Sequence, residues 1–302
     1  MTLNDTTLDL RHLGRDRYVG SELLITSAGP VLLDVGPGST LPALETGLAA
    51  AGLRIEDLHA VLLSHIHFDH AGAAGLLVER NPALPIFVHE RGARHLHDPS
   101  RLIASATRIY GDRMDTLWGR LAPIPLANLR TLTGGETLEF GDRRFEVTAA
   151  PGHAVHHVVY FERATATAYL GDNGGVNVPA LPLTLPVTPP PDFDLEAWLA
   201  TIDRIEALGP ERLWCTHFGF SPDPRDHLPA LRAGLIAWVA KGKELLADDG
   251  TDTDRASRFH DWALASLSGR ADDTAIRRFA DFAAFGSSFD GIARYLRRPP
   301  AA

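Results

Sequence analysis

The chain has 302 residues, 45% of them hydrophobic and 22% charged, and is long enough to bury the core of a large globular domain. Its formal net charge of −9 argues against a basic nucleic-acid-binding face, and its single cysteine excludes an internal disulfide. The first residues lack the basic and apolar segments of a signal peptide, and no apolar run is long enough to span a bilayer. We therefore expect a cytoplasmic protein that binds neither nucleic acid nor membrane.

The first part of the chain alternates strands with helices. Residues 8–27 and 31–35 have strand character, and apolar residues at helical spacing predict a helix over 41–51. A buried strand at 60–63 and a short strand at 85–89 follow. This alternation is typical of an α/β (α+β) fold.

Three imidazoles and a carboxylate follow the buried strand at 60–63 within six residues: His65, His67, Asp69 and His70. Because these residues come directly after a strand, a loop at its end can fold His65 and His67 toward a common centre. Imidazole and carboxylate are suitable ligands for a borderline divalent ion such as zinc. The alternative is a set of solvated loop histidines, but this density of ligand-type side chains favours a metal site.

An apolar helical face is predicted within residues 99–120, where apolar side chains recur at three- and four-residue steps. Tyr110, Met114 and Trp118 lie on this face, and they are our candidates for the wall of a substrate pocket. The alternative is that they only pack the helix onto the core.

Three more ligand-type residues stand at the ends of predicted strands. A strand at 145–148 leads into a Pro-Gly turn before His153, a hairpin over 157–170 precedes Asp172, and a strand at 212–216 ends at His217. We therefore expect these side chains at the same edge of the fold as the cluster that begins at His65.

The segment 177–192 contains six prolines, which remove backbone donors and predict irregular structure. This segment either borders the pocket as a stiff rim or carries the chain across to a helix at 195–208. Beyond it, the composition becomes rich in Ala, Leu and Arg. The pattern predicts four helices, over 228–247, 255–267, 272–285 and 289–297.

The chain is therefore divided into a metal-binding domain, 1–221, and a helical C-terminal region, 222–302. The helical region could form a homodimer interface or a lid over the site, or it could pack internally. Four of its aromatic residues need burial: Phe279, Phe282, Phe285 and Phe289.

Together these motifs resemble the metallo-β-lactamase superfamily. The H-x-H-x-D-H pattern at 65–70 is its most specific mark, and the other ligand-type residues follow in the family's order. The segment 31–36 is similar to an early family strand whose aspartate, here Asp34, supports the metal site from behind. The resemblance covers about residues 8 to 220 and implies an αββα sandwich, here with a helical C-terminal extension.

The resemblance also implies two divalent metal ions, with zinc expected and manganese or iron as alternatives. One ion would be held by His65, His67 and His153. The second would be held by Asp69, His70 and His217, with Asp172 bridging the pair. Asp34 would fix a ligand histidine, although a buried aspartate that caps backbone amides is the alternative.

The implied reaction is hydrolysis of an ester, thioester or lactone-type bond in a small molecule. Two metal ions can share a water and lower its pKa, which supplies a bridging hydroxide as nucleophile at neutral pH. Asp69 would orient this group and accept its proton, and it is our candidate catalytic residue.

The residues around the motif have features of more than one branch of the family. The segment 64–72 resembles the acyl-homoserine lactonases, but these place a Tyr shortly after the bridging Asp, where this chain has Asn173, Gly174 and Gly175. Glyoxalase II-like thioesterases usually have Thr before the first ligand His, and Ser64 is close to this. The function therefore has open alternatives, a mononuclear iron oxidoreductase of the persulfide dioxygenase type or a phosphodiesterase.

Overall fold

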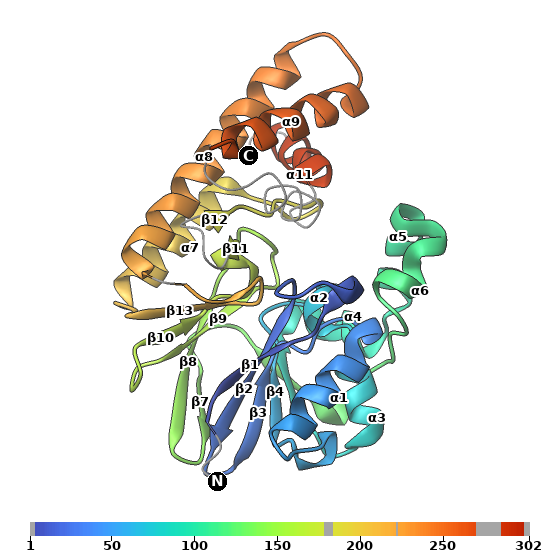
Figure 1. The fold of residues 1–302 in the computed structure, drawn as a ribbon, viewed down its shortest axis with the longest axis vertical. Coiled ribbons are helices and arrows are strands. Elements are labelled where there is room, and N and C mark those ends of the chain that lie inside the picture. Colours follow the sequence, from blue (N-terminus) through green and yellow to red (C-terminus); the bar gives the residue numbers. More distant parts are fainter. Residues whose placement is uncertain (1–3, 178–183, 222, 270–284, 299–302) are drawn as a thin grey trace.

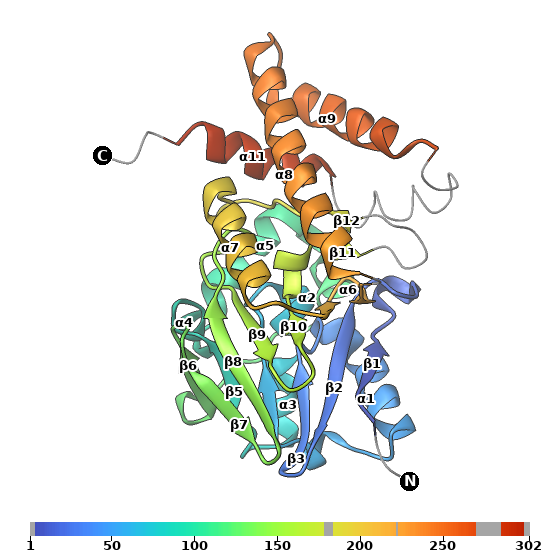
Figure 2. The ribbon, with the colours of Figure 1, turned by 90° about the vertical axis from the view of Figure 1, so that its left-hand side faces the viewer.

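The computed structural model describes residues 4–177, 184–221, 223–269 and 285–298. Two six-stranded β-sheets pack face to face, and helices cover their outer faces (Figures 1 and 2). The predicted αββα sandwich with C-terminal helices is therefore confirmed.

The first sheet has strands in sequence order. β1 to β3 are antiparallel, and β3 to β6 are parallel. Its strands are β1 (Thr6–Asp9), β2 (Gly20–Thr26), β3 (Gly29–Leu33), β4 (Ala60–Leu62), β5 (Ile86–His89) and β6 (Leu129–Leu132). The helices α1 (Leu41–Ala50), α3 (Ala74–Arg80) and α4 (Glu90–His97) contribute buried side chains to the cluster on its outer face, as Leu44, Leu77 and Leu96 do.

The second sheet has the order β14-β13-β10-β9-β8-β7. Its strands are β7 (Thr137–Phe140), β8 (Arg143–Ala149), β9 (Val158–Glu162), β10 (Thr167–Tyr169), β13 (Arg212–Cys215) and β14 (Gly219–Phe220). Val158 and Tyr160 belong to the cluster between the sheets, whereas Val159 and Phe161 belong to the cluster with Trp198 of α7 (Leu195–Ala207). The two-residue period of a strand thus places β9 between two cores.

Short helices occur in the loops at both ends of the strands. They are η1 (His12–Gly14), η2 (Gly38–Thr40), η3 (Ile55–Asp57), α2 (Phe68–Ala71), η5 (Leu126–Asn128) and η6 (Gly171–Gly174). The helical face predicted over 99–120 is split into α5 (Ser100–Tyr110), η4 (Gly111–Arg113) and α6 (Met114–Leu117). The break occurs at Gly111, whose φ of +52° suits glycine and ends α5.

The C-terminal helices form an arm beside the second sheet (Figure 1). They are α8 (Pro224–Ala247), α9 (Asp252–Leu267) and α11 (Phe285–Leu296), in agreement with three of the predicted helices. Phe285 and Phe289 are buried beside Trp238 and Phe259. Most of the predicted helix at 272–285, with Phe279 and Phe282, lies outside the described residues.

The arm shares one hydrophobic cluster with α7, because Leu228 and Leu231 of α8 pack in the same cluster as Trp198. The division of the chain at residue 221 stays a prediction. The proline-rich segment is not wholly irregular, since β11 (Val176–Asn177) pairs with β12 (Thr184–Leu185), at positions that contain no proline. Within the described residues, no helix has both the length and the apolar character needed to cross a bilayer.

The carboxyl group of Glu22, on β2, is buried. Thr7 Oγ1 donates a hydrogen bond to Glu22 Oε2 at 2.5 Å, while Glu22 Oε1 has no partner among the described groups. Burial raises the pKa of Glu22 from 4.5 to about 7. The folded state therefore favours the protonated form, and the carboxylate costs stability as pH rises from 4.5 through 7.

We predict that Glu22→Gln stabilises the protein at high pH only. The shift in the pKa of Glu22 corresponds to about 3 kcal/mol, which the wild-type protein loses between pH 4.5 and pH 8 and the amide does not. Thermal unfolding at pH 5 and pH 8.5 should show a Tm advantage of several degrees for the variant at pH 8.5 alone. The exposed Glu211→Gln is the control, and the same Tm difference at both pH values would contradict the prediction.

Candidate metal centre

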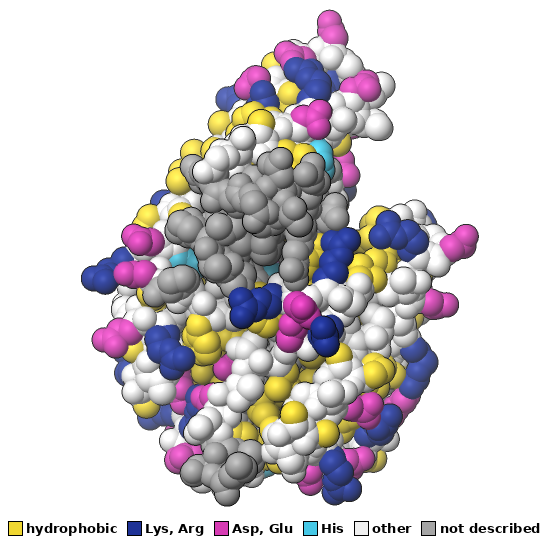
Figure 3. Space-filling model, in the orientation of Figure 1, with side chains coloured by type: hydrophobic (Ala, Val, Ile, Leu, Met, Phe, Trp, Pro, Cys, Tyr) yellow, Lys and Arg dark blue, Asp and Glu magenta, His cyan; other side chains and the backbone are white. Residues whose placement is uncertain are grey.

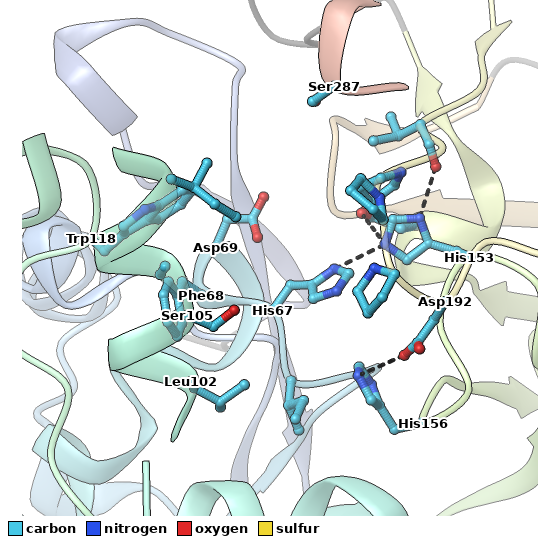
Figure 4. Close-up of a pocket in the computed structure, with 18 of the residues that line it drawn as sticks. His67, Phe68, Asp69, Leu102, Ser105, Trp118, His153, His156, Asp192 and Ser287 are labelled. Atoms are coloured by element: carbon cyan, nitrogen blue, oxygen red, sulfur yellow. Dashed lines mark hydrogen bonds and ion pairs between the residues drawn. The ribbon is translucent and has the colours of Figure 1, made fainter. Parts of the chain in front are cut away.

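The seven predicted ligands come together where several strands end (Figure 4 shows part of the site). His65 and His67 follow β4, His153 follows β8, Asp172 follows β10 and His217 follows β13. β8, β10 and β13 run in the same direction, so their carboxyl ends lie at one edge of the second sheet. Asp69 and His70 are presented by the short helix α2.

Two glycines allow the ligand loops to pack closely. Gly152, before His153, has a φ of +144°, and a Cβ there would lie 2.4 Å from Cα of Trp198. Gly171, before Asp172, has a φ of +52°, and a Cβ there would lie 2.5 Å from Cβ of Ser64. Both positions therefore require glycine for backbone conformation and for space.

The first group of donor atoms consists of three imidazoles. Nδ1 of His67 lies 2.8 Å from Nε2 of His65 and 3.0 Å from Nε2 of His153. Nδ1 of His153 donates to the carbonyl oxygen of Val187, and Nδ1 of His65 lies 3.0 Å from Ser64 Oγ. With their protons on Nδ1, His65 and His153 both direct Nε2 lone pairs toward His67.

The second group of donor atoms consists of one carboxylate and two imidazoles, those of Asp69, His70 and His217. Nε2 of His70 lies 3.9 Å from Asp69 Oδ1, and Nε2 of His217 lies 3.5 Å from Asp69 Oδ2. Nδ1 of His217 donates to the carbonyl oxygen of Tyr18 at 2.8 Å, which directs its Nε2 toward the carboxylate of Asp69.

Asp172 lies between the two groups. Its Oδ2 is 3.2 Å from Nε2 of His153, and its Oδ1 is 3.1 Å from Nε2 of His70 and 3.2 Å from Nε2 of His217. Its backbone N–H donates to Nε2 of His157, which fixes the start of the loop. One carboxylate oxygen thus faces each group, as a bridging ligand requires.

The protonation of the two groups differs. Burial, with the neighbouring His70 and His67, holds the pKa of His65 well below its usual value, and burial beside His153 lowers the pKa of His67 to about 3. Burial also opposes a charge on His217, but Asp172 and Asp69 outweigh it and raise its pKa to about 9. The first group therefore offers neutral lone pairs, and the second attracts positive charge, for which protons and a metal ion compete.

Asp34 supports the centre from behind. It is fully buried, and its Oδ2 accepts hydrogen bonds from Ser64 Oγ at 2.8 Å, Thr216 Oγ1 at 2.7 Å and His70 Nδ1 at 2.7 Å. Its Oδ1 accepts from the backbone N–H of Ser64 at 2.8 Å. The bond to His70 keeps that proton on Nδ1 and directs Nε2 toward Asp172.

A cleft of about 1100 Å³ opens over the cluster. His67, Asp69, His153, Asp172 and His217 reach it. In Figure 4, His67 lies between Phe68, Asp69 and Trp118 on one side and His153, His156 and Asp192 on the other.

The family model of the metallo-beta-lactamase superfamily matches residues 19–217, which include all seven clustered residues and every strand of the two sheets except β1 and β14. The chain belongs to the metallo-beta-lactamase superfamily. It is 29% identical over 208 residues to a hydroxyacylglutathione hydrolase of Synechococcus sp., a match that covers 67% of this chain and 64% of the relative. A second hydroxyacylglutathione hydrolase, from Aeromonas hydrophila, is 25% identical over 214 residues, 68% of this chain and 67% of that relative. The match thus spans about two thirds of the length of these relatives, 64% of the first and 67% of the second.

Solved structures show the same fold. A metallo-beta-lactamase family protein from Thermus thermophilus aligns over 92% of this chain and 88% of its own, with a TM-score of 0.69 and 24% identity. An archaeal superfamily protein from Sulfolobus tokodaii aligns over 97% of this chain and 99% of its own, with a TM-score of 0.67 and 16% identity. The second alignment includes nearly the whole length of both chains, the C-terminal helices among them.

Membership in the metallo-beta-lactamase superfamily implies divalent metal ions, and the donor set fits them. Nε2 of His70 and Oδ1 of Asp172 are buried and lie 3.1 Å apart, but neither atom makes a well-aligned hydrogen bond. The two groups, together with Asp172, offer five imidazole nitrogens and two carboxylates, and the donor atoms within each group lie close to one another. Nitrogen and carboxylate oxygen are the ligands expected for zinc and similar ions.

The candidate pocket residues differ in their placement. Tyr110 and Trp118 line the cleft, whereas Met114 is not among the lining residues, because the break at Gly111 starts a new helix at Met114. Sequence reasoning assigned no supporting role to Ser64 or Thr216, which bind Asp34. Each directly precedes a ligand histidine at a strand end, and that position is the signal that could have identified them.

We predict that Asp34→Asn weakens metal binding about 10- to 100-fold, because an amide cannot accept from all the donors around Asp34. Competition with a zinc chelator measures the affinity, with the exposed Asp261→Asn as control. Circular dichroism should show that the variant is folded. Unchanged affinity in a folded variant would contradict the supporting role.

Proposed function

We propose that the protein is a dinuclear metal-dependent hydrolase that cleaves an ester, thioester or lactone-type bond of a small molecule, with zinc as the expected metal. His65, His67 and His153 would hold one ion, and Asp69, His70 and His217 the other, with Asp172 between them. When bound, such ions make water nucleophilic at neutral pH and polarise the substrate carbonyl oxygen. The main support is the convergence of these seven side chains in two adjoining groups, five members of which reach the cleft.

Asp69 is the candidate catalytic residue. Its side chain is 22% exposed and lines the cleft, whereas the side chain of Asp172 is 4% exposed. An oxygen of Asp69 is therefore within reach of a molecule in the cleft. In this position Asp69 can accept a proton from the attacking water and pass it to the leaving group.

The two named relatives support the thioester within this substrate class, since their name indicates cleavage of an acyl group carried by glutathione. Asn173, Gly174 and Gly175 stand after Asp172, where lactonases place a Tyr; Asn173 is fully buried, and its Nδ2 donates to the carbonyl oxygen of Ala150. This side chain supports the loop and offers no phenol to a lactone. We therefore place a thioester or open-chain ester ahead of a lactone.

The size of the cleft suits a small molecule. The net charge of −9 also speaks against a nucleic-acid substrate. A cytoplasmic location and a homodimer stay proposals.

A hydrolysis screen of the metal-loaded protein with thioesters, aryl esters, lactones and phosphodiesters tests this function. We predict hydrolysis of thioesters or esters, and a fall in rate of about 100- to 10,000-fold in Asp69→Asn because the proton acceptor is lost. Metal content is measured on the same samples, and Asp115→Asn, an exposed change on α6, is the control. Equal rates in wild type and Asp69→Asn would refute the role of Asp69, and no turnover of any ester or thioester would refute the hydrolase.

A further inference from the structure

One wall of the cleft is apolar although it faces solvent. Leu102, Ala106 and Ile109 of α5 line it together with Leu117 of α6. Six large hydrophobic side chains are exposed among the described residues, and three of them line this cleft: Leu13 at 44%, Ile109 at 69% and Val155 at 38%. An exposed apolar surface concentrated in a cleft is typical of a binding site for an apolar group.

The wall ends in an aromatic group beside Asp69. The ring of Trp118 lies 5.3 Å from that of Tyr110 and 5.7 Å from that of Phe68, and it stacks on His12 at 5.8 Å. Figure 4 shows Trp118 and Phe68 on the same side of the cleft as Asp69. An apolar substituent of a carbonyl held at the metal cluster would therefore contact these rings.

The other end of the cleft bears two exposed arginines together with acidic groups. Arg91 and Arg94 of α4 line it, and no carboxylate of the described residues lies within ion-pair distance of either. Arg94 Nε donates to the ring of His95. Burial and then Arg94 and Arg101 lower the pKa of His95, which therefore adds no charge near neutral pH.

Within the part of the chain that the structure describes, some arginines outside the cleft lining, such as Arg108, also have no carboxylate partner, so the position of Arg91 and Arg94 in the cleft lining is what makes their charge available to a bound molecule. Many other arginines pair with carboxylates, among them Arg80, Arg120, Arg143 and Arg163. The acidic groups that also line this end are Glu90 and Asp192, and Asp192 Oδ2 lies 3.8 Å from Nε2 of His156. The space-filling view shows basic and hydrophobic side chains meeting in the notch between the arm and the α5–α6 segment (Figure 3).

The metal cluster lies between the two ends. Helix α4 packs beside His156, because a Cβ on Gly92 would lie 3.7 Å from Cβ of His156 and 2.6 Å from Ile66. In Figure 4, His156 and Trp118 lie on opposite sides of His67. A molecule that crosses the cluster thus contacts aromatic rings at one end and arginines at the other.

We propose that the substrate is an amphiphilic thioester or ester, with an apolar acyl group against Trp118 and the α5 wall and an anionic carrier beside Arg91 and Arg94. This inference rests on the proposed hydrolase and names its substrate class. In the reaction the oxygen of water bonds to the acyl carbon, and the bond from that carbon to the carrier's sulfur or oxygen breaks. One proton from water passes to the carrier and the other is released to solvent, so the products are a fatty carboxylate and an anionic thiol or alcohol, with no oxidation or reduction.

The charge of the carrier is tested with two decanoyl thioesters, one of 3-mercaptopropionate, which is anionic, and one of N-acetylcysteamine, which is neutral. The wild-type protein should prefer the anionic thioester about five- to tenfold in kcat/KM. The double variant Arg91→Ala/Arg94→Ala should lose this preference, so that kcat/KM for the anionic thioester is no higher than kcat/KM for the neutral one. The control is Arg108→Ala, at an arginine of α5 outside the cleft lining, and this variant should keep the preference for the anionic thioester. No preference in wild type, or a preference that survives the double variant, would overturn the assignment.

The acyl group is tested on the 3-mercaptopropionate carrier with acetyl, hexanoyl and decanoyl groups. We expect kcat/KM to rise at least about tenfold from acetyl to decanoyl, because several methylenes leave water at the wall. Ile109→Asp should remove most of this rise. Leu126→Asp, at a residue that is 66% exposed and outside the cleft lining, should not. Equal rates for acetyl and decanoyl would overturn the apolar subsite.

Binding of a thioether separates this inference from the proposed hydrolase. S-decyl-3-mercaptopropionate has the alkyl chain and the carboxylate charge but no thioester carbonyl. Calorimetry measures its binding to the metal-loaded protein. Tight binding that is weakened about tenfold in Arg91→Ala/Arg94→Ala supports the amphiphilic site even if no thioester is hydrolysed. Thioester hydrolysis with equal binding of this thioether to wild type and the double variant would keep the hydrolase and refute the anionic subsite.

Discussion

The site depends on the buried carboxylate of Asp34. It follows β3 of the first sheet, and its oxygens accept from Ser64 after β4 and from Thr216 after β13 of the second sheet. The same carboxylate holds His70, so one group fixes the ends of strands from both sheets and the direction of a ligand ring. A buried carboxylate with four donors is stable only if all of them stay in place, and the geometry of the metal cluster follows from this network.

The sequence predicted the sandwich and the clustered residues because both leave local signals. Buried strands are continuous apolar runs, as at 60–63, and the predicted ligand residues follow such strands. The pairing partners of Asp34 could not be predicted, because Thr216 lies 182 positions away and hydroxyls leave no periodic pattern. The break of the helix at Gly111 was also missed, although a glycine inside a helical pattern is a recognisable signal.

The rim of the cleft is a tertiary feature that the sequence alone left open. Pro189 and Pro190 line the cleft, and the preceding Thr188 donates through Oγ1 to the carbonyl oxygen of Ser288 in α11. A Cβ on Gly291 would overlap the backbone of Thr188, so helix and rim are in close contact. The arm therefore helps to position the rim, a contact across 100 residues that no local pattern encodes.

The central claim is that the seven clustered side chains bind two metal ions. Metal-free protein is loaded with zinc, and the bound ions per chain are counted by native mass spectrometry. The account predicts two zinc ions per chain for the wild-type protein and fewer than two for Asp172→Ala, because this change removes the carboxylate that faces both groups. A single ion per wild-type chain, or none, would contradict it.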